Sequence, residues 1–79
     1  MPNYAIKRAA LVVGAKIVST AQPGLGKVLE LTKIHPTGYD RASGANRSFI
    51  EYDFREVESG AERRSFTLNY INRYFALQL

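Results

Sequence analysis

Two runs rich in branched apolar residues, Leu11–Val18 and Lys27–Leu31, flank a short segment that contains one proline and two glycines, and the strand that begins with the second run is expected to extend to about Ile34. Branched apolar residues favour strands, whereas proline fixes φ and glycine accepts positive φ, so together they favour a tight turn. The stretch therefore predicts a strand, a turn at Ala21–Gly26 and a second strand. Gly14, two residues before Lys16, adds a point where the first strand can bend sharply, as strands of small β-barrels do.

Length and composition limit the kind of protein that this chain can form. Its 79 residues predict one domain with a small core, so a large enclosed active site is not expected. A hydrophobic fraction of 46% argues against disorder, and no apolar run approaches the roughly 20 residues that span a membrane. The absence of cysteine excludes disulfides and cysteine-ligated zinc. We expect a soluble, cytoplasmic protein with no membrane partner and an oligomeric state that the sequence does not specify.

Alternation of apolar and polar residues predicts which side chains face the core. In the first run, Ile17 and Val13 are expected to point inward and Lys16 outward. In the second run, apolar residues occupy both faces, which is typical of a long, bent strand shared between two layers. The clearest alternation lies in Ser48–Glu56, where residues 50, 52 and 54 are apolar and residues 51, 53 and 55 are charged. That segment predicts a strand with one buried face.

The remaining segments complete a small β fold. His35–Arg47 is rich in Gly, Ser and Asn and has no periodicity, so it predicts a long loop. Residues 58–62 predict a turn and residues 63–68 a returning hairpin strand. Asn69–Asn72 predicts one 3₁₀ turn and Tyr74–Leu79 a closing strand, with a short amphipathic helix from Leu68 to Leu77 as the alternative. The predicted fold is all-β, a small five-stranded SH3-like (Tudor-like) barrel over residues 10–79 with a short 3₁₀ turn before the last strand. Residues 1–9 are expected to form an N-terminal arm or edge strand.

The sequence pattern V-x-x-x-I-V, P-G-x-G-x-V, F-I-x-Y-x-F and F-x-L resembles the Tudor-like, SH3-like domains of CarD-type transcription factors and of the C-terminal tails of UvrD/PcrA-type helicases. In those domains the skeleton G-D-x-V, G-x-G-x-V and I-x-F marks the first three strands. The matching residues here are Gly14, Ile17 or Val18, Gly24, Gly26, Val28, Ile50, Tyr52 and Phe54. The resemblance covers residues 11–77 and implies contact with RNA polymerase or nucleic acid. Two departures are Ala15, where those domains have an acidic residue, and a longer second loop.

Few residues suit catalysis. His35 is the only histidine, stands beside Pro36 at the start of the loop and has no partner that the sequence reveals, so an ordinary loop residue is expected. Glu51 and Asp53 share a strand face and suit at most a weak cation site; solvated positions are the simpler interpretation. The segment Pro23–Lys27 lacks the spacing of a phosphate loop and precedes a strand. We predict no enzyme, no cofactor and no metal site; an enzyme whose site forms on oligomerisation is a weaker alternative.

Positive charge is concentrated in the first part of the chain. Residues 1–50 contain seven Lys or Arg and two acids, whereas residues 51–79 contain four bases and five acids. The imbalance suits a surface that faces a polyanion, in which cations bind phosphates and exposed aromatic rings stack on bases. The predicted nucleic-acid-binding residues are Lys16, Lys27, Lys33, Tyr39, Arg41 and Arg47. Tyr70 and Tyr74 are predicted to bind a protein, or alternatively to pack at the end of the barrel with their hydroxyls in water.

The charge and the resemblance favour a non-catalytic binding module in nucleic-acid transactions that contacts DNA, RNA or RNA polymerase. The alternative is a protein-interaction or host-factor-inhibiting module of a phage or other mobile element, which uses aromatic residues and a sheet edge. The first hypothesis predicts an affinity that falls steeply with salt. The second predicts a stoichiometric protein partner and little binding to bare nucleic acid.

Overall fold

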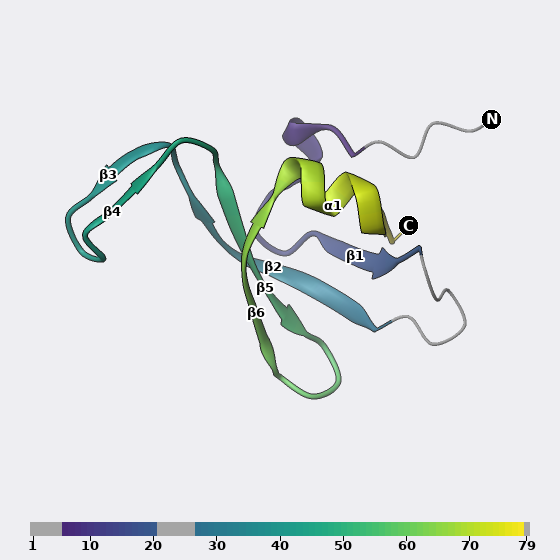
Figure 1. Ribbon diagram of the computed structural model, residues 1–79. Coiled ribbons are helices and arrows are strands. Elements are labelled where there is room, and N and C mark those ends of the chain that lie inside the picture. Colours follow the sequence, from purple (N-terminus) through teal and green to yellow (C-terminus); the bar gives the residue numbers. More distant parts are fainter. Residues whose placement is uncertain (1–5, 21–26, 79) are drawn as a thin grey trace.

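The computed structural model describes residues 6–20 and 27–78, and in these ranges the chain forms seven strands, one α-helix and one 3₁₀ helix (Figure 1). In chain order the elements are η1 (Arg8–Ala10), β1 (Lys16–Ser19), β2 (Val28–His35), β3 (Gly38–Asp40), β4 (Ala45–Arg47), β5 (Glu51–Glu56), β6 (Glu62–Thr67), α1 (Leu68–Tyr74) and β7 (Phe75–Leu77). Five strands form an antiparallel sheet in the order β6-β5-β2-β1-β7, and β3 pairs with β4 in a second sheet. The predicted turn at 21–26, residues 1–5 of the predicted arm and Leu79 lie outside the described residues.

The fold is mostly β, as predicted, but the sheet is open and the predicted five-stranded barrel is wrong. β6 and β7 are the outer strands of the five-stranded sheet, and no ladder joins them within the described ranges. Their ends approach each other through side chains, because the ring centroids of Phe66 and Phe75 lie 5.7 Å apart. The helix α1 connects these two strands directly in the chain.

The core lies on one face of the five-stranded sheet. Tyr52 and Phe54 of β5 are buried together with Ile17 of β1 and Leu31 of β2, and Ile71 of α1 covers them. Burial of an apolar side chain of this size contributes about 1.5–3 kcal/mol, and these five are the largest fully buried side chains of the described residues. The predicted inward positions of Ile17, Tyr52 and Phe54 are confirmed.

The first predicted strand is shorter than expected because the chain turns at Gly14. Its φ of 97° is a left-handed conformation that interrupts an extended chain. The Gly14 N–H donates to the Leu31 carbonyl at 2.9 Å, and the Leu31 N–H donates to the Ala15 carbonyl at 2.8 Å, so this segment is hydrogen-bonded to β2 before β1 begins. Val13 precedes the turn and is 66% exposed. The prediction that Val13 faces the core is wrong.

The segment predicted as a loop, His35–Arg47, contains the hairpin β3–β4, which projects away from the main sheet in Figure 1. The Asp40 carboxylate closes its turn by accepting hydrogen bonds from the Ala42 N–H and the Ser43 hydroxyl, each at 2.9 Å. Strands of three residues that bury no continuous face leave no periodic pattern. The residue pattern of this segment therefore does not indicate strands.

Residues 68–74 form an α-helix instead of the predicted 3₁₀ turn, so the chain is not all-β. Thr67 caps the helix, because its hydroxyl oxygen accepts a hydrogen bond from the Tyr70 N–H at 3.2 Å. The alternative prediction, an amphipathic helix from Leu68 to Leu77, agrees better with the structure, although the helix ends at Tyr74 and the chain continues as β7. Of the helices in the described ranges, none combines the length and apolarity that a membrane-spanning helix needs.

Candidate functional site

Asp53, in the middle of β5, lies between two irregularities of the sheet. On one side, Leu31 pairs with Phe54 and Lys33 pairs with Asp53, which leaves Thr32 as an additional residue in β2. On the other side, Tyr52 pairs with Phe66 and Phe54 with Arg63, so two residues of β6 oppose Asp53. Such bulges re-aim side chains and are common beside functional sites.

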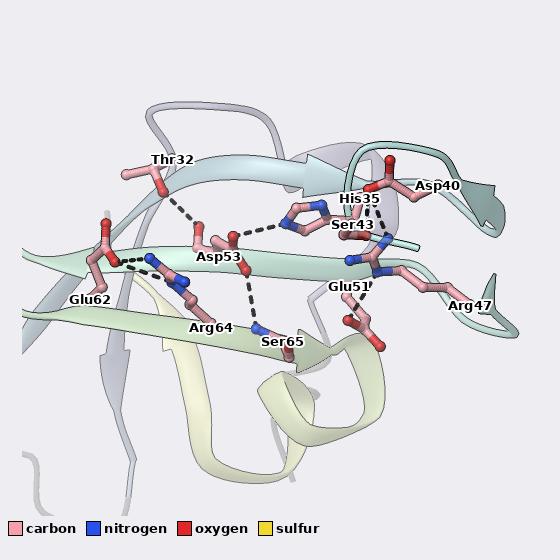
Figure 2. Close-up of polar contacts among 10 residues, drawn as sticks. All are labelled: Thr32, His35, Asp40, Ser43, Arg47, Glu51, Asp53, Glu62, Arg64 and Ser65. Atoms are coloured by element: carbon pink, nitrogen blue, oxygen red, sulfur yellow. Dashed lines mark hydrogen bonds and ion pairs between the residues drawn. The ribbon is translucent and has the colours of Figure 1, made fainter. Parts of the chain in front are cut away.

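Asp53 contacts both bulges, one through its main-chain carbonyl and the other through its carboxylate (Figure 2). Its Oδ2 lies 2.8 Å from His35 Nε2, and its Oδ1 accepts the Ser65 N–H at 3.1 Å. The Thr32 hydroxyl donates to the Asp53 carbonyl oxygen at 3.2 Å. Ser65 has a φ of 65°, which is an unfavourable conformation for a residue with a side chain. The hydrogen bond from its N–H to the Asp53 carboxylate stabilises this conformation.

The His35–Asp53 pair lines a polar hollow on the solvent face of the sheet. Both side chains are more than four-fifths buried, and the hollow is also lined by Lys33 and by the ion pair of Arg64 with Glu62. Burial raises the pKa of Asp53, but the hydrogen bonds from His35 and the Ser65 N–H, with the charges of His35 and Arg64, bring the pKa below its usual value. Charged and hydrogen-bonding groups of this kind can hold a polar or anionic group. The described residues contain no group of three or more His, Asp or Glu side chains placed to hold a metal ion.

Arg47 joins the projecting hairpin to the main sheet. Its guanidinium contacts Asp40 Oδ2 at 3.3 Å and Glu51 Oε1 at 3.2 Å, and its side chain is only 13% exposed (Figure 2). Hydrogen bonds from Ser43 and the Ala42 N–H, with the nearby Arg47, hold the pKa of Asp40 below its usual value. Arg47 is predicted as a phosphate contact, and in the structure its guanidinium lies between two carboxylates.

Glu56 is a buried acid at the far end of β5, in phase with the apolar residues of that strand. Its carboxylate accepts a hydrogen bond from Ser59 at 2.9 Å and pairs with Arg63 and, at 3.3 Å, with Lys27. The hydrogen bond from Ser59, with the charges of Arg63 and Lys27, lowers the pKa of Glu56. Lys27, another predicted phosphate contact, is therefore an ion-pair partner that remains largely exposed.

The other four predicted nucleic-acid-binding residues are exposed and lie in three places. Lys16 is on β1 and Lys33 on the solvent face of β2. Tyr39 is on β3 and is 68% exposed, and Arg41 follows it in the hairpin turn. Tyr39 and Arg41 thus belong to the β3–β4 hairpin, whereas Lys16 and Lys33 belong to the five-stranded sheet.

The two tyrosines predicted as protein contacts lie on α1, four residues apart and both partly exposed. Their ring centroids are 5.0 Å apart, and the Tyr70 ring packs at 4.8 Å on Phe66. The prediction that Tyr70 and Tyr74 bind a protein stays a prediction. Arg73 lies between them in sequence, and sequence reasoning did not include it.

Ion pairs involve most of the acidic side chains of the protein but fewer than half of its Lys and Arg side chains. Six of the seven acids lie at ion-pair distance from a basic side chain, and Glu58 is the exception within the described ranges. Six of the eleven Lys and Arg residues have no acidic partner among the described residues: Lys7, Arg8, Lys16, Lys33, Arg41 and Arg73. The surplus of positive charge therefore resides in these six side chains.

Sequence reasoning missed the roles of His35 and Glu56. His35 ends β2 and is paired with Asp53, so the expectation of an ordinary loop residue is wrong. No local pattern marks that pair, because its two residues are 18 positions apart. Glu56 could have been found, since it continues the inward phase of Tyr52 and Phe54.

Comparison of the chain with protein-family models, with curated proteins and with solved structures found no match.

Proposed function

We propose that this protein is a non-catalytic module that binds nucleic acid through cations on the solvent face of its sheet and through the β3–β4 hairpin. The strongest support for this proposal is that ion pairs take up a larger share of the acidic side chains than of the basic ones. Among the described residues, nearly every acidic side chain lies at ion-pair distance from a basic one, while six Lys and Arg side chains have no acidic partner. A polyanion approaching the protein then meets little opposing negative charge.

The hairpin suits contact with a phosphate backbone. It projects from the body of the protein in Figure 1 and presents Tyr39 and Arg41 to solvent. Arg47 anchors its base through Asp40 and Glu51, so the hairpin can keep its direction when a partner binds. Lys33 and Lys16 extend the positive charge across β2 and β1.

The order of elements supports the resemblance to SH3-like domains and, through it, a partner in transcription or repair such as RNA polymerase. Apart from the hairpin β3–β4, the chain contains two adjacent strands, a strand pair and a helix before the last strand, which returns to pair with β1. In this proposal the domain is a Tudor-like fold whose sheet is left open by α1.

The test is binding to a labelled duplex, titrated with salt. For the wild type we expect log K to fall linearly with log salt, by about 0.9 for each phosphate neutralised. The triple variant Lys16→Gln/Lys33→Gln/Arg41→Gln should lose about two to three units of that slope. Arg47 is left unchanged because its loss would disturb the hairpin.

The matched control neutralises the other three unpaired cations, in the variant Lys7→Gln/Arg8→Gln/Arg73→Gln, which has the same net charge. It should bind the duplex more tightly than the first triple variant does. Wild-type protein that binds no nucleic acid at low salt would refute the proposal, and so would equal losses in the two triple variants.

A protein partner is the second candidate, because the outer edges of β6 and β7 are unpaired in the described sheet. A partner strand can add to such an edge by main-chain hydrogen bonds. This function predicts a stoichiometric complex in native mass spectrometry together with no salt-sensitive binding to nucleic acid.

A further inference from the structure

The start of the described chain and the helix α1 lie side by side, although they are more than sixty residues apart in sequence. The Asn72 side chain joins them: its Nδ2 donates to the Ile6 carbonyl at 3.2 Å, and the Ile6 N–H donates to its Oδ1. Ile6 and Ile71 are both buried in the core beneath this contact. The two segments therefore form one surface, which we call the η1–α1 surface.

This surface is basic and contains no acid. The sequence has no Asp or Glu in residues 6–20 or 67–78. Lys7 and Arg8 on one side and Arg73 on the other all lack an acidic partner within the described ranges. Half of the unpaired cations of the protein thus belong to this surface.

The same surface presents aromatic rings that are already ordered. Tyr70 and Tyr74 are 43% and 41% exposed, so part of each ring faces solvent. Tyr70 packs on Phe66 at 4.8 Å and on Phe75 at 6.2 Å, which limits the positions that its ring can take. A ring that is held in place loses little conformational entropy when a ligand stacks on it.

Two hollows meet at Asn69 on this surface. One is lined by Arg8, Phe49, Ile50 and Leu68, and the other by Tyr70, Arg73 and Tyr74. The first is mainly apolar and contains Phe49, which is 68% exposed, and Arg8 is the charged residue of its lining. A polymer whose units each carry a planar ring and a negative charge would complement a surface on which aromatic rings and cations lie near one another.

We propose that the η1–α1 surface binds single-stranded nucleic acid, with unpaired bases stacked on Tyr70 and Tyr74 and phosphates near Lys7, Arg8 and Arg73. Stacking requires an open base face, which a duplex does not offer along its length. The lack of acids favours a polyanion over a basic or neutral peptide. The inference rests on the proposed function, but it assigns a separate surface and a separate class of ligand.

The experiment compares an oligothymidylate of about 15 nucleotides with an abasic oligonucleotide of the same length, because single-stranded sites span roughly 4–16 nucleotides. Wild-type protein should prefer the thymidylate by about tenfold or more, since each stacked base contributes substantially to affinity. In Tyr70→Leu/Tyr74→Leu the preference should disappear, because leucine keeps apolar bulk but offers no ring. In the matched control Tyr70→Phe/Tyr74→Phe it should persist. Urea unfolding of each variant shows whether the fold is kept.

A second arm tests the charges. The variant Lys7→Gln/Arg8→Gln/Arg73→Gln should lower the salt slope for the thymidylate by about two, at ~0.7 for each phosphate of a single strand. The control Lys16→Gln/Lys33→Gln/Arg41→Gln should leave the preference for thymidylate over the abasic strand unchanged.

The outcomes separate this inference from the proposed function. Equal binding of thymidylate and abasic strand by the wild type would overturn the inference, and so would a folded leucine variant that keeps the preference. If either occurs while salt-sensitive duplex binding remains, the proposed function stands alone. If neither oligonucleotide nor duplex binds at low salt, both fail.

Discussion

His35 Nε2 and Asp53 Oδ2 lie 2.8 Å apart across the adjacent strands β2 and β5, at the point where both neighbours of β5 are bulged. The second carboxylate oxygen of Asp53 binds the N–H of Ser65, whose φ is positive. The Asp53 side chain therefore links β2 to the bulge of β6, and its removal should affect the sheet more than the removal of an exposed acid would.

Asp53→Asn should lower the free energy of unfolding by about 1–3 kcal/mol, because the amide cannot replace a carboxylate that accepts from both His35 and the Ser65 N–H. Urea denaturation measures this change. Glu62→Gln is the control, since Glu62 is exposed and pairs with Arg64 on the surface. Equal midpoints for the two variants would contradict the role assigned to Asp53.

Acid should destabilise the protein through the same carboxylate. The pKa of Asp53 in the folded protein lies below its ordinary value of 3.8, so the unfolded chain takes up the proton first as the pH falls. The stabilisation is complete well above pH 3.8 and is lost as the pH falls through the folded pKa. Urea midpoints measured between neutral pH and about pH 3 should decline less steeply for Asp53→Asn than for the wild type. Parallel curves would contradict this origin of the decline.

Arg47→Lys should loosen the β3–β4 hairpin without unfolding the sheet. An ammonium group cannot reproduce the planar contact of the guanidinium with both Asp40 and Glu51. Amide hydrogen exchange in the hairpin should accelerate by about threefold to tenfold, while exchange in β5 is unchanged. Arg41→Lys, in the exposed turn, should change neither rate. Equal acceleration in the hairpin and β5 would indicate global destabilisation instead.

Ser65→Gly should raise the free energy of unfolding by up to about 1 kcal/mol, because glycine adopts a φ of 65° without the steric cost of a side chain. Ser48→Gly is the matched control at an exposed position without positive φ, and it should be neutral or slightly destabilising. Thermal unfolding of both variants gives the comparison. A loss of stability in Ser65→Gly would mean that the serine hydroxyl matters more than the backbone conformation.

The sequence by itself determined the parts of the fold that depend on local alternation. β5 and β6 were predicted as a hairpin, and the inward positions of Ile17, Tyr52 and Phe54 were confirmed. Alternation is a local property, because neighbouring side chains of a strand point to opposite faces whatever the rest of the chain does. The predicted roles of the exposed cations and tyrosines in binding remain predictions.

The tertiary structure alone decided which distant residues meet. Only the pairing of β2, β5 and β6 places His35, Asp53 and Ser65 together. In the same way, only the hydrogen bonds between Ile6 and Asn72 place the N-terminal segment beside α1. Register, bulges and ion pairs arise from contacts between segments that are far apart in the chain, and a residue pattern within one segment carries no record of them. For the same reason, the sequence showed a net charge of +4 but not which cations the acids leave unpaired.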